Sequence, residues 1–281
     1  MRIDVVTLFP ELFERFLTVG MVGRAVSTGA ARVRLRSPRD FGIGKHRSVD
    51  DTPYGGGSGM VMRVDCIAQC LEALDADVDA AGEATAPGAP ARAHRVLLTP
   101  QGQPFRQDKA SELSGRPAIA LICGRYEGFD ERVRELVDEE ISLGDFVLSG
   151  GEVAAMAVID ACVRLLPGVL GNAESTEHES HSSALGGRLE YPQYTRPVEF
   201  RGLRVPEVLQ QGNHAAIARW RREQAELRTA ERRPDLLQRA REQSAEAGGE
   251  PRAAEARQAP AEPRAAEARQ APEPRSTEER R

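Results

Sequence analysis

The sequence predicts an α/β fold built on a mainly parallel β-sheet. Four short apolar runs are separated by segments whose apolar residues recur at helical spacing, and this alternation is typical of parallel strands joined by helices. The runs are almost continuously apolar, as expected for strands that are covered on both faces. A chain of 281 residues is long enough to bury a complete core.

The predicted strands and helices alternate from the N-terminus onward. The predicted strands are 3–9 (IDVVTLF), 95–100 (RVLLTP), 118–124 (AIALICG) and 145–151 (DFVLSGG). The predicted helices are 10–29, 64–74 and 152–166. A further helix with many arginines is predicted after residue 213.

Two segments are predicted to lie outside the folded part of the chain. Residues 76–93 are rich in Ala, Gly and Pro and hold little to bury, so they predict a surface insertion. From about Arg239 to Arg281 the chain is of low complexity, and EPRAAEARQAP occurs twice, from Glu250 and from Glu262. Two proline-broken copies cannot form a solenoid, so we expect a disordered tail.

Composition limits the location of the protein. No apolar run reaches the eighteen residues of a membrane span, and the first ten residues predict a strand rather than a leader. The four cysteines predict reduced thiols in a cytoplasmic protein. Cys66 and Cys70 lie one helical turn apart without a second Cys or His pair, which favours core packing over a zinc site.

The net charge of −5 argues against a nucleic-acid partner, yet it averages over two basic clusters. One cluster lies within residues 32–47 and the other within residues 219–233. Charge alone leaves two readings open for each cluster, a solvated face or a phosphate-binding surface.

Three predicted strands end in turns that contain glycine. The turns are TPQGQ from Thr99, CGRYEG from Cys123 and LSGGE from Leu148. Ligands of parallel sheets bind beyond the carboxyl ends of the strands, where glycine lets the backbone approach closely. Each turn by itself is explained as a tight connection, but the three together favour a pocket.

The kind of ligand is narrowed by two missing motifs. The sequence has neither a GxxxxGK[ST] phosphate loop nor a GxGxxG turn after the first strand. A compact ligand held by main-chain groups and apolar walls, such as an adenosine-bearing cofactor, suits the three turns.

Eight motifs resemble those of the bacterial tRNA (guanine-N1)-methyltransferase family. They are SPRDFG (Ser37), HRSVDDTPYGGGSGMVM (His46), LTPQG (Leu98), CGRYEGFDERV (Cys123), ISLGDFVLSGGE (Ile141), PGVLGN (Pro167), YTRP (Tyr194) and GNHAAIARWRREQ (Gly212). They follow the order of that family from Met1 to about Leu237. The resemblance implies methyl transfer from S-adenosylmethionine to N1 of the guanosine 3′ of the tRNA anticodon.

The resemblance also implies a SPOUT-class fold with a deep trefoil knot, a homodimer and a magnesium requirement. The domains expected from it are a knotted cofactor-binding domain at 1–168, a flexible linker at 169–187, a small helical tRNA-binding domain at 188–238 and the tail at 239–281. For magnesium the resemblance suggests help from Glu127, although no Asp, Glu or His spacing indicates a metal site independently.

The resemblance assigns the glycine turns to S-adenosylmethionine. The residues expected to contact it are Leu98, Thr99, Pro100, Gln101, Gly124, Tyr126, Glu127, Gly128, Ile141, Ser142, Gly144, Phe146, Leu148, Gly150 and Gly151. Phe146 stands where many relatives carry tyrosine, so ring stacking is kept without the hydroxyl.

The reaction needs a base because N1 of guanine carries a proton at neutral pH, and it needs a positive group beside O6. The resemblance places Glu179 as the base and Arg164 at O6. Relatives usually have aspartate at the position of Glu179, so its reach is longer by one methylene. Glu177, His178 and His181 remain alternative bases.

The tRNA is expected to contact two regions. Asp50, Tyr54 and Gly55 lie beside the glycine-rich stretch that would receive a guanine flipped out of its stack. In the basic helix, Arg219 and Arg222 are expected to contact phosphates, whereas the neighbouring Trp220 is expected to pack in a small helical core.

Overall fold

The computed structural model describes residues 1–80, 92–171 and 178–248. The chain divides into two compact units, Met1–Ala240 and Arg241–Arg281, and the first holds the sheet and the pocket described below. Most of the insertion expected at 76–93 and most of the tail expected at 239–281 lie outside the described residues.

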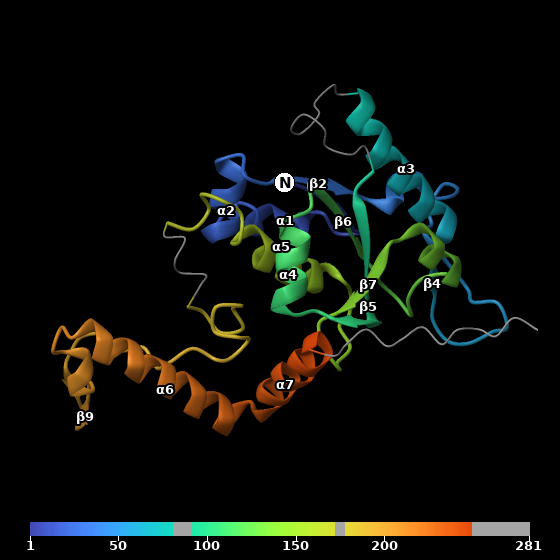
Figure 1. Cartoon of the computed structure of the whole chain (residues 1–281). Coiled ribbons are helices and arrows are strands. Elements are labelled where there is room, and N and C mark those ends of the chain that lie inside the picture. Colours follow the sequence, from blue (N-terminus) through green and yellow to red (C-terminus); the bar gives the residue numbers. More distant parts are fainter. Residues whose placement is uncertain (81–91, 172–177, 249–281) are drawn as a thin grey trace, which may run out of the picture. The chain divides into compact units, whose positions relative to one another are not determined.

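A five-stranded sheet forms the centre of the first unit (Figure 1). Its order is β2 (Arg32–Arg36), β1 (Arg2–Val6), β6 (Ala118–Cys123), β5 (His94–Pro104) and β7 (Glu139–Ser142). Every neighbouring pair is parallel. The prediction of a mainly parallel α/β sheet is therefore confirmed.

Two hydrophobic cores cover the two faces of the sheet. Ile119 and Leu121 belong to one core and Ile122 to the other, because successive side chains of a strand point to opposite faces. The first core packs against α1 (Glu11–Phe16), α2 (Gly20–Ser27), α4 (Gln107–Ser114) and α5 (Glu152–Val163). The second packs against α3 (Val64–Ala80) and the 3₁₀-helices η1 (Pro38–Phe41) and η2 (Glu131–Leu136).

Cys66 and Cys70 are buried in the second core as free thiols, in agreement with the predicted packing role. Burial raises the pKa of Cys70 to about 12, because the thiolate would lose its hydration there. Both thiols are therefore protonated packing groups at neutral pH.

Two strand predictions need correction. Residues 145–151 form a loop, and the strand of this region is β7, which ends before Leu143. The apolar residues of the loop point into a pocket and to solvent, so their apolar character does not come from burial under helices. Conversely, β2 was read only as part of a basic cluster, although its arginines alternate with Val33 and Leu35, which pack against the first core.

The small elements complete the described chain. Strands β3 (Asp50–Asp51) and β4 (Val61–Met62) pair antiparallel, as do β8 (Glu199–Phe200) and β9 (Leu203–Arg204). They are followed by the 3₁₀-helix η4 (Glu207–Leu209), α6 (His214–Arg232) and α7 (Pro234–Gly248). No helix among the described residues is long and apolar enough to cross a membrane.

Two local signals set the limits of α6 and α7. Asn213 caps α6, its side chain accepting a hydrogen bond from the backbone N–H of Ala216 at 3.1 Å. Pro234 begins α7, because proline fits the first turn of a helix and cannot continue the preceding one.

Candidate functional site

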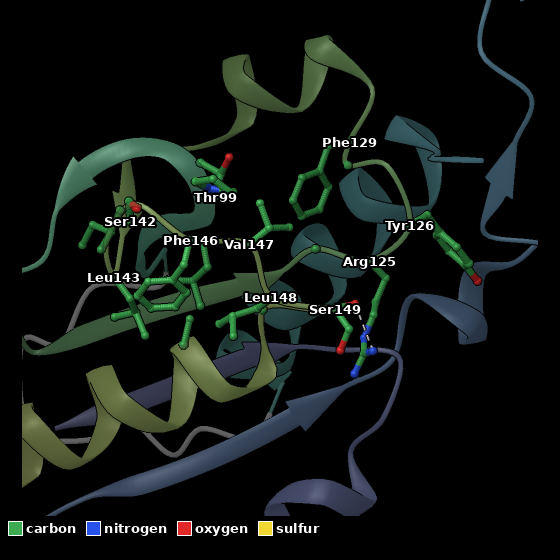
Figure 2. Close-up of a pocket in the computed structure, with 18 of the residues that line it drawn as sticks. Thr99, Arg125, Tyr126, Phe129, Ser142, Leu143, Phe146, Val147, Leu148 and Ser149 are labelled. Atoms are coloured by element: carbon green, nitrogen blue, oxygen red, sulfur yellow. Dashed lines mark hydrogen bonds between the residues drawn. The ribbon is translucent and has the colours of Figure 1, made fainter. Parts of the chain in front are cut away.

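A pocket opens at the carboxyl ends of β5, β6 and β7, beside the N-terminus of α5 (Figure 2). It encloses about 740 Å³, including its open mouth, which suits a small organic ligand. Its walls are Leu98–Pro100, Gly124–Phe129, Ile141–Gly144, Phe146–Gly151 and Ala154. The three glycine-bearing turns therefore meet in one place, as their positions after parallel strands predicted.

The first wall exists because β5 leaves β7 and returns to it. Both Leu98 and Gln103 pair with Ile141, so the residues between them loop out of the ladder. Gly102 allows the return, since a Cβ atom there would lie 2.4 Å from the backbone nitrogen of Ile141. The excursion places Thr99 and Pro100 on the pocket.

The second and third walls touch through their backbones. The N–H of Gly151 donates to the carbonyl of Gly124 at 2.9 Å. A Cβ atom on Gly151 would lie 2.8 Å from Cα of Cys123, so only glycine permits this approach. Tyr126 has a φ of 59°, an unusual value for a side chain of this size and a local strain of the kind found at functional sites.

An open apolar surface forms the side of the pocket that faces solvent. Phe146, Val147 and Leu148 are 54%, 85% and 37% exposed, although all three are large and apolar. They gather with Leu143, whereas the ring of Tyr126 projects away from them (Figure 2). The wall can therefore cover the apolar part of a ligand.

All the residues expected to contact the cofactor line this pocket except Gln101. The side chain of Gln101 accepts a hydrogen bond from Arg134 outside the pocket. The contacts with a cofactor stay a prediction, since lining describes position only. The pocket also holds residues that were not expected, namely Arg125, Phe129, Leu143, Val147, Ser149 and Ala154. All but Phe129 and Ala154 lie between expected residues in the same motifs, which is the signal that could have identified them.

Arg164 and Glu179 are brought together, but away from this pocket. Arg164 donates from Nη1 to Oε2 of Glu179 at 2.7 Å and from Nη2 to Oε1 at 2.5 Å. The hydrogen bonds to this carboxylate raise the pKa of Arg164 above its usual value. Arg164 follows the last residue of α5, whose twelve residues measure about 18 Å, and the pocket lies at the first.

The turn that carries Glu179 is held by a series of hydrogen bonds. The N–H of Ser182 donates to the carbonyl of Glu179 at 3.1 Å, and the N–H of Glu190 donates to Oγ of Ser180 at 3.1 Å. The N–H of Leu189 donates to Oγ1 of Thr229 at 3.0 Å, and Thr229 is fully buried on α6. The turn is thereby fastened to the basic helix.

The glycine-rich stretch adjoins the pocket. Its Met60 donates an N–H to Oε2 of Glu127 at 2.7 Å, and the N–H of Glu127 donates to the carbonyl of Met60 at 3.1 Å. Tyr54 is fully exposed, Gly55 has a φ of 87°, and Asp50 pairs with Met62 across the β3–β4 ladder. Asp50, Tyr54 and Gly55 therefore do not line the pocket, and the stretch reaches its wall through the contact of Met60 with Glu127.

The two basic clusters differ. In the first, Arg34 donates to Asp4 at 2.6 Å and 2.9 Å, and Arg36 pairs with Asp77, so two of its charges are neutralised within the fold. In the second, Arg219 and Arg222 are exposed on α6 and do not line the pocket. The ring of Trp220 contacts that of Tyr194 at a centroid distance of 6.4 Å, which fits the predicted packing role.

The donor set for a metal is poor. Within residues 1–80, 92–171 and 178–248 no group of three His, Cys, Asp or Glu side chains could hold an ion. The carboxylate of Glu127 already accepts the N–H of Met60. These residues do not fit a magnesium site formed by the protein alone.

Comparison with known proteins agrees with the resemblance in the motifs. The family model described as tRNA (Guanine-1)-methyltransferase TrmD matches residues 1–239. A protein named tRNA (guanine-N(1)-)-methyltransferase from Sorangium cellulosum is 75% identical over 265 residues, covering 91% of this chain and 98% of that protein. Proteins of the same name from Geobacter sulfurreducens and Syntrophotalea carbinolica are 51% and 52% identical, covering 85% of this chain and 92% and 91% of theirs. The chain therefore belongs to the tRNA (guanine-1)-methyltransferase TrmD family.

Proposed function

We propose that this protein transfers a methyl group from S-adenosylmethionine to N1 of the guanosine 3′ of the tRNA anticodon. The observation that carries the proposal is the meeting of three glycine-bearing turns in one pocket, in a chain that matches its family from the first residue to residue 239. The pocket supports the proposed cofactor site, and the family match supports the proposed class of reaction.

The walls of the pocket fit S-adenosylmethionine. Glycine at 102 and 151 lets backbone segments approach where a Cβ atom would collide, which brings the turns close enough to enclose a small ligand. Phe146 and Leu148 offer apolar surface to the rest of the ligand. S-adenosylmethionine supplies an electrophilic methyl group when it is bound.

The protein's own residues manage the proton. Glu179 takes the N1 proton of guanine, and Arg164 stabilises the negative charge that develops on O6. In the free pair both carboxylate oxygens of Glu179 accept hydrogen bonds from Arg164. When O6 accepts an N–H of Arg164 in place of the carboxylate, an oxygen of Glu179 is released for the proton.

A homodimer is part of the proposal because one chain does not bring the pair to its own pocket. Arg164 and Glu179 lie at the end of α5 remote from the pocket. A second copy that set its Arg164–Glu179 pair beside this pocket would complete the site. The proposed domains are a trefoil-knotted cofactor domain at 1–168, a linker at 169–187 and a helical tRNA-binding domain at 188–238.

The tRNA contacts are proposed on charge and exposure. Arg219 and Arg222 are exposed on one helix, as phosphate contacts require. Asp50, Tyr54 and Gly55 belong to the glycine-rich stretch that contacts the pocket wall through Met60 and Glu127, and they are proposed to receive the flipped guanine. No step is assigned to magnesium, since the described donors do not fit it.

The proposal is tested by methyl transfer to two tRNA transcripts that differ only in the nucleotide 3′ of the anticodon, guanosine or adenosine. We expect labelled methyl in the guanosine transcript alone, recovered as N1-methylguanosine after digestion. Labelling of both transcripts would contradict the position. Labelling of neither, with S-adenosylmethionine and tRNA still bound in calorimetry, would indicate a binding protein that lost catalysis through the glutamate at position 179.

A further inference from the structure

A buried charge cluster stands directly behind the pocket. Glu152, the first residue of α5, is only 1% exposed. Its Oε2 lies 2.9 Å from Nη2 of Arg125, and its Oε1 accepts the hydroxyl of Thr7 at 2.9 Å. Thr7 is itself fixed, since Oγ1 accepts the N–H of Phe9 at 3.0 Å.

Arg125 joins two walls of the pocket. Its backbone belongs to the turn Gly124–Gly128, while its Nη1 donates to the carbonyl of Ser149 at 3.1 Å in the opposite turn (Figure 2). Its guanidinium also covers the ring of Phe9 at 4.6 Å from the centroid, and its backbone N–H donates to Sδ of Met62 at 3.3 Å. The side chain is therefore held from several directions.

The contact is too tight to be incidental. A Cβ atom on Gly150 would lie 2.2 Å from Nε of Arg125 and 2.5 Å from Oε2 of Glu152. Glycine at this position lets the turn lie directly against the ion pair. The guanidinium and the carboxylate therefore pack directly against the backbone of Gly150.

We propose that Arg125, seated on Glu152, is a positioning residue that fixes the distance between the two glycine-bearing turns and so preforms the cofactor pocket. This inference rests on the proposed function, because it takes S-adenosylmethionine as the ligand. Arg125 acts through the backbone of Ser149 and Gly150. Because the turns are already ordered in the folded protein, less conformational entropy is lost when the ligand binds.

The rival explanation is that the pair merely stabilises the fold. Replacing both partners of a buried ion pair by apolar residues is often neutral for stability, whereas removing one partner leaves a buried charge. The double variant Arg125→Met/Glu152→Met therefore removes the bridge to Ser149 while keeping the interior filled. Arg125→Lys is the second variant, because lysine keeps the charge but cannot contact Glu152 and Ser149 with one planar group.

A direct contact between Arg125 and the ligand is the other rival. S-adenosylhomocysteine has an amino-acid carboxylate, and 5′-methylthioadenosine lacks it. Loss of a contact to that carboxylate would weaken only the first ligand. Loss of a preformed pocket would weaken both by the same factor.

The experiment measures the Kd of both ligands by calorimetry for the parent and the two variants, with melting temperatures alongside. A matched control is Arg95→Met/Asp75→Met, an ion pair of 2.7 Å at the start of β5 that does not line the pocket. We expect the double variant to raise both Kd values at least about tenfold, Arg125→Lys to raise both by a smaller and equal factor, and the control to leave both unchanged. The Kd for tRNA should stay at the parent value throughout.

Each opposing result is distinct. If the parent binds S-adenosylhomocysteine and the double variant, still folded, binds both ligands equally well, the positioning role is wrong. If only S-adenosylhomocysteine weakens, Arg125 is a ligand contact instead. If the double variant does not fold, a parent-like Kd in Arg125→Lys overturns the inference. If the parent binds neither ligand, the proposed function fails first and the inference with it.

Discussion

Arg164 and Glu179 hold each other through two nearly parallel hydrogen bonds, of 2.7 Å and 2.5 Å. The two side chains are 26% and 33% exposed, so water can still reach the pair. A bidentate pair of this kind fixes both direction and distance. In this chain the carboxylate of the pair belongs to Glu179.

The first prediction concerns the base. Glu179→Gln keeps the size of the side chain but removes the proposed proton acceptor, so the methyl-transfer rate at saturating substrates should fall by at least about 100-fold. The Kd for S-adenosylmethionine should not change. Single-turnover transfer of labelled methyl measures the rate. Glu177→Gln serves as the control, and loss of activity there with retention in Glu179→Gln would move the base to Glu177.

The second prediction concerns the aromatic wall. The ring of Phe146 is half exposed on the pocket wall and should be covered by the ligand. Phe146→Ala should raise the Kd for S-adenosylmethionine by about tenfold, since aromatic contacts of this kind contribute about 1 kcal/mol. Phe146→Tyr should bind within about twofold of the parent, because the face of the ring is kept. A parent-like Kd in the alanine variant would exclude this wall from the binding site.

The third prediction concerns the contact between two glycine turns. Gly151→Ala places a methyl group 2.8 Å from Cα of Cys123, so the two turns must separate. We expect a loss of about 1–3 kcal/mol in the free energy of unfolding, measured in urea, and weaker cofactor binding. Gly115→Ala is the control, as its nearest neighbour would be the carbonyl oxygen of Glu112 at 3.4 Å. Equal effects of the two substitutions would show that the approach at Gly151 is not limiting.

The fourth prediction concerns phosphate binding. Arg219→Gln and Arg222→Gln should each raise the KM for tRNA and each reduce by about one the slope of log K against log salt concentration. The KM for S-adenosylmethionine should remain that of the parent. Arg116→Gln is the matched control, because Arg116 lies just after α4 and pairs with Glu112 on that helix. An unchanged salt slope in both variants on α6 would remove this helix from the tRNA surface.

The fifth prediction concerns three charged side chains at the end of α4, namely Lys109, Glu112 and Arg116. Hydrogen bonds from Lys109 and Arg116 lower the pKa of Glu112 to about 2. Because the folded pKa lies below the unfolded one, the triad stabilises the fold above about pH 4.5, and the contribution disappears as the pH falls through about 2. Glu112 is 45% exposed, so solvent screening limits the effect of Glu112→Gln to about 0.5 kcal/mol at pH 7.

Urea unfolding at pH 7, 4.5 and 2.5 checks this dependence. Glu72→Gln on α3 is the control, because Glu72 is exposed and no ion pair of it is found in the part of the chain that the structure describes. A difference between Glu112→Gln and the parent that grows toward low pH would contradict the sign.

The sequence was sufficient for the fold class because strands such as 118–123 are buried along their whole length and contain no polar residue. The strand prediction was wrong at 145–151, where the apolar residues Phe146–Leu148 form part of the wall of a pocket. Hydrophobic periodicity and composition cannot distinguish a strand that is buried under helices from an apolar loop that lines a ligand pocket. The glycine on either side of that run was the better indicator of a loop.

The parts of the candidate site that follow from the position of a turn after a strand were predictable from the sequence. The parts that depend on pairing between distant side chains were not. Turns that follow adjacent parallel strands must meet, so the pocket lining could be anticipated from Thr99, Cys123 and Leu148. The pairing of Arg125 with Glu152 could not, because arginine at a surface turn and glutamate at a helix start are both ordinary features. Nor did the sequence indicate that Arg34 and Arg36 would form ion pairs with Asp4 and Asp77.

Helix α5 begins directly after Gly151 in the pocket wall and ends directly before Arg164. Its length therefore sets the distance between the pocket and Arg164. Inserting or deleting one residue within it would turn everything beyond by about 100° around the helix axis and shift it by about 1.5 Å. The Arg164–Glu179 pair would then be turned and shifted relative to the pocket, while the pocket end of the helix stayed in place. We therefore expect α5 to tolerate substitutions better than insertions or deletions. Changes of chain length should be tolerated in connections such as the one between α3 and β5.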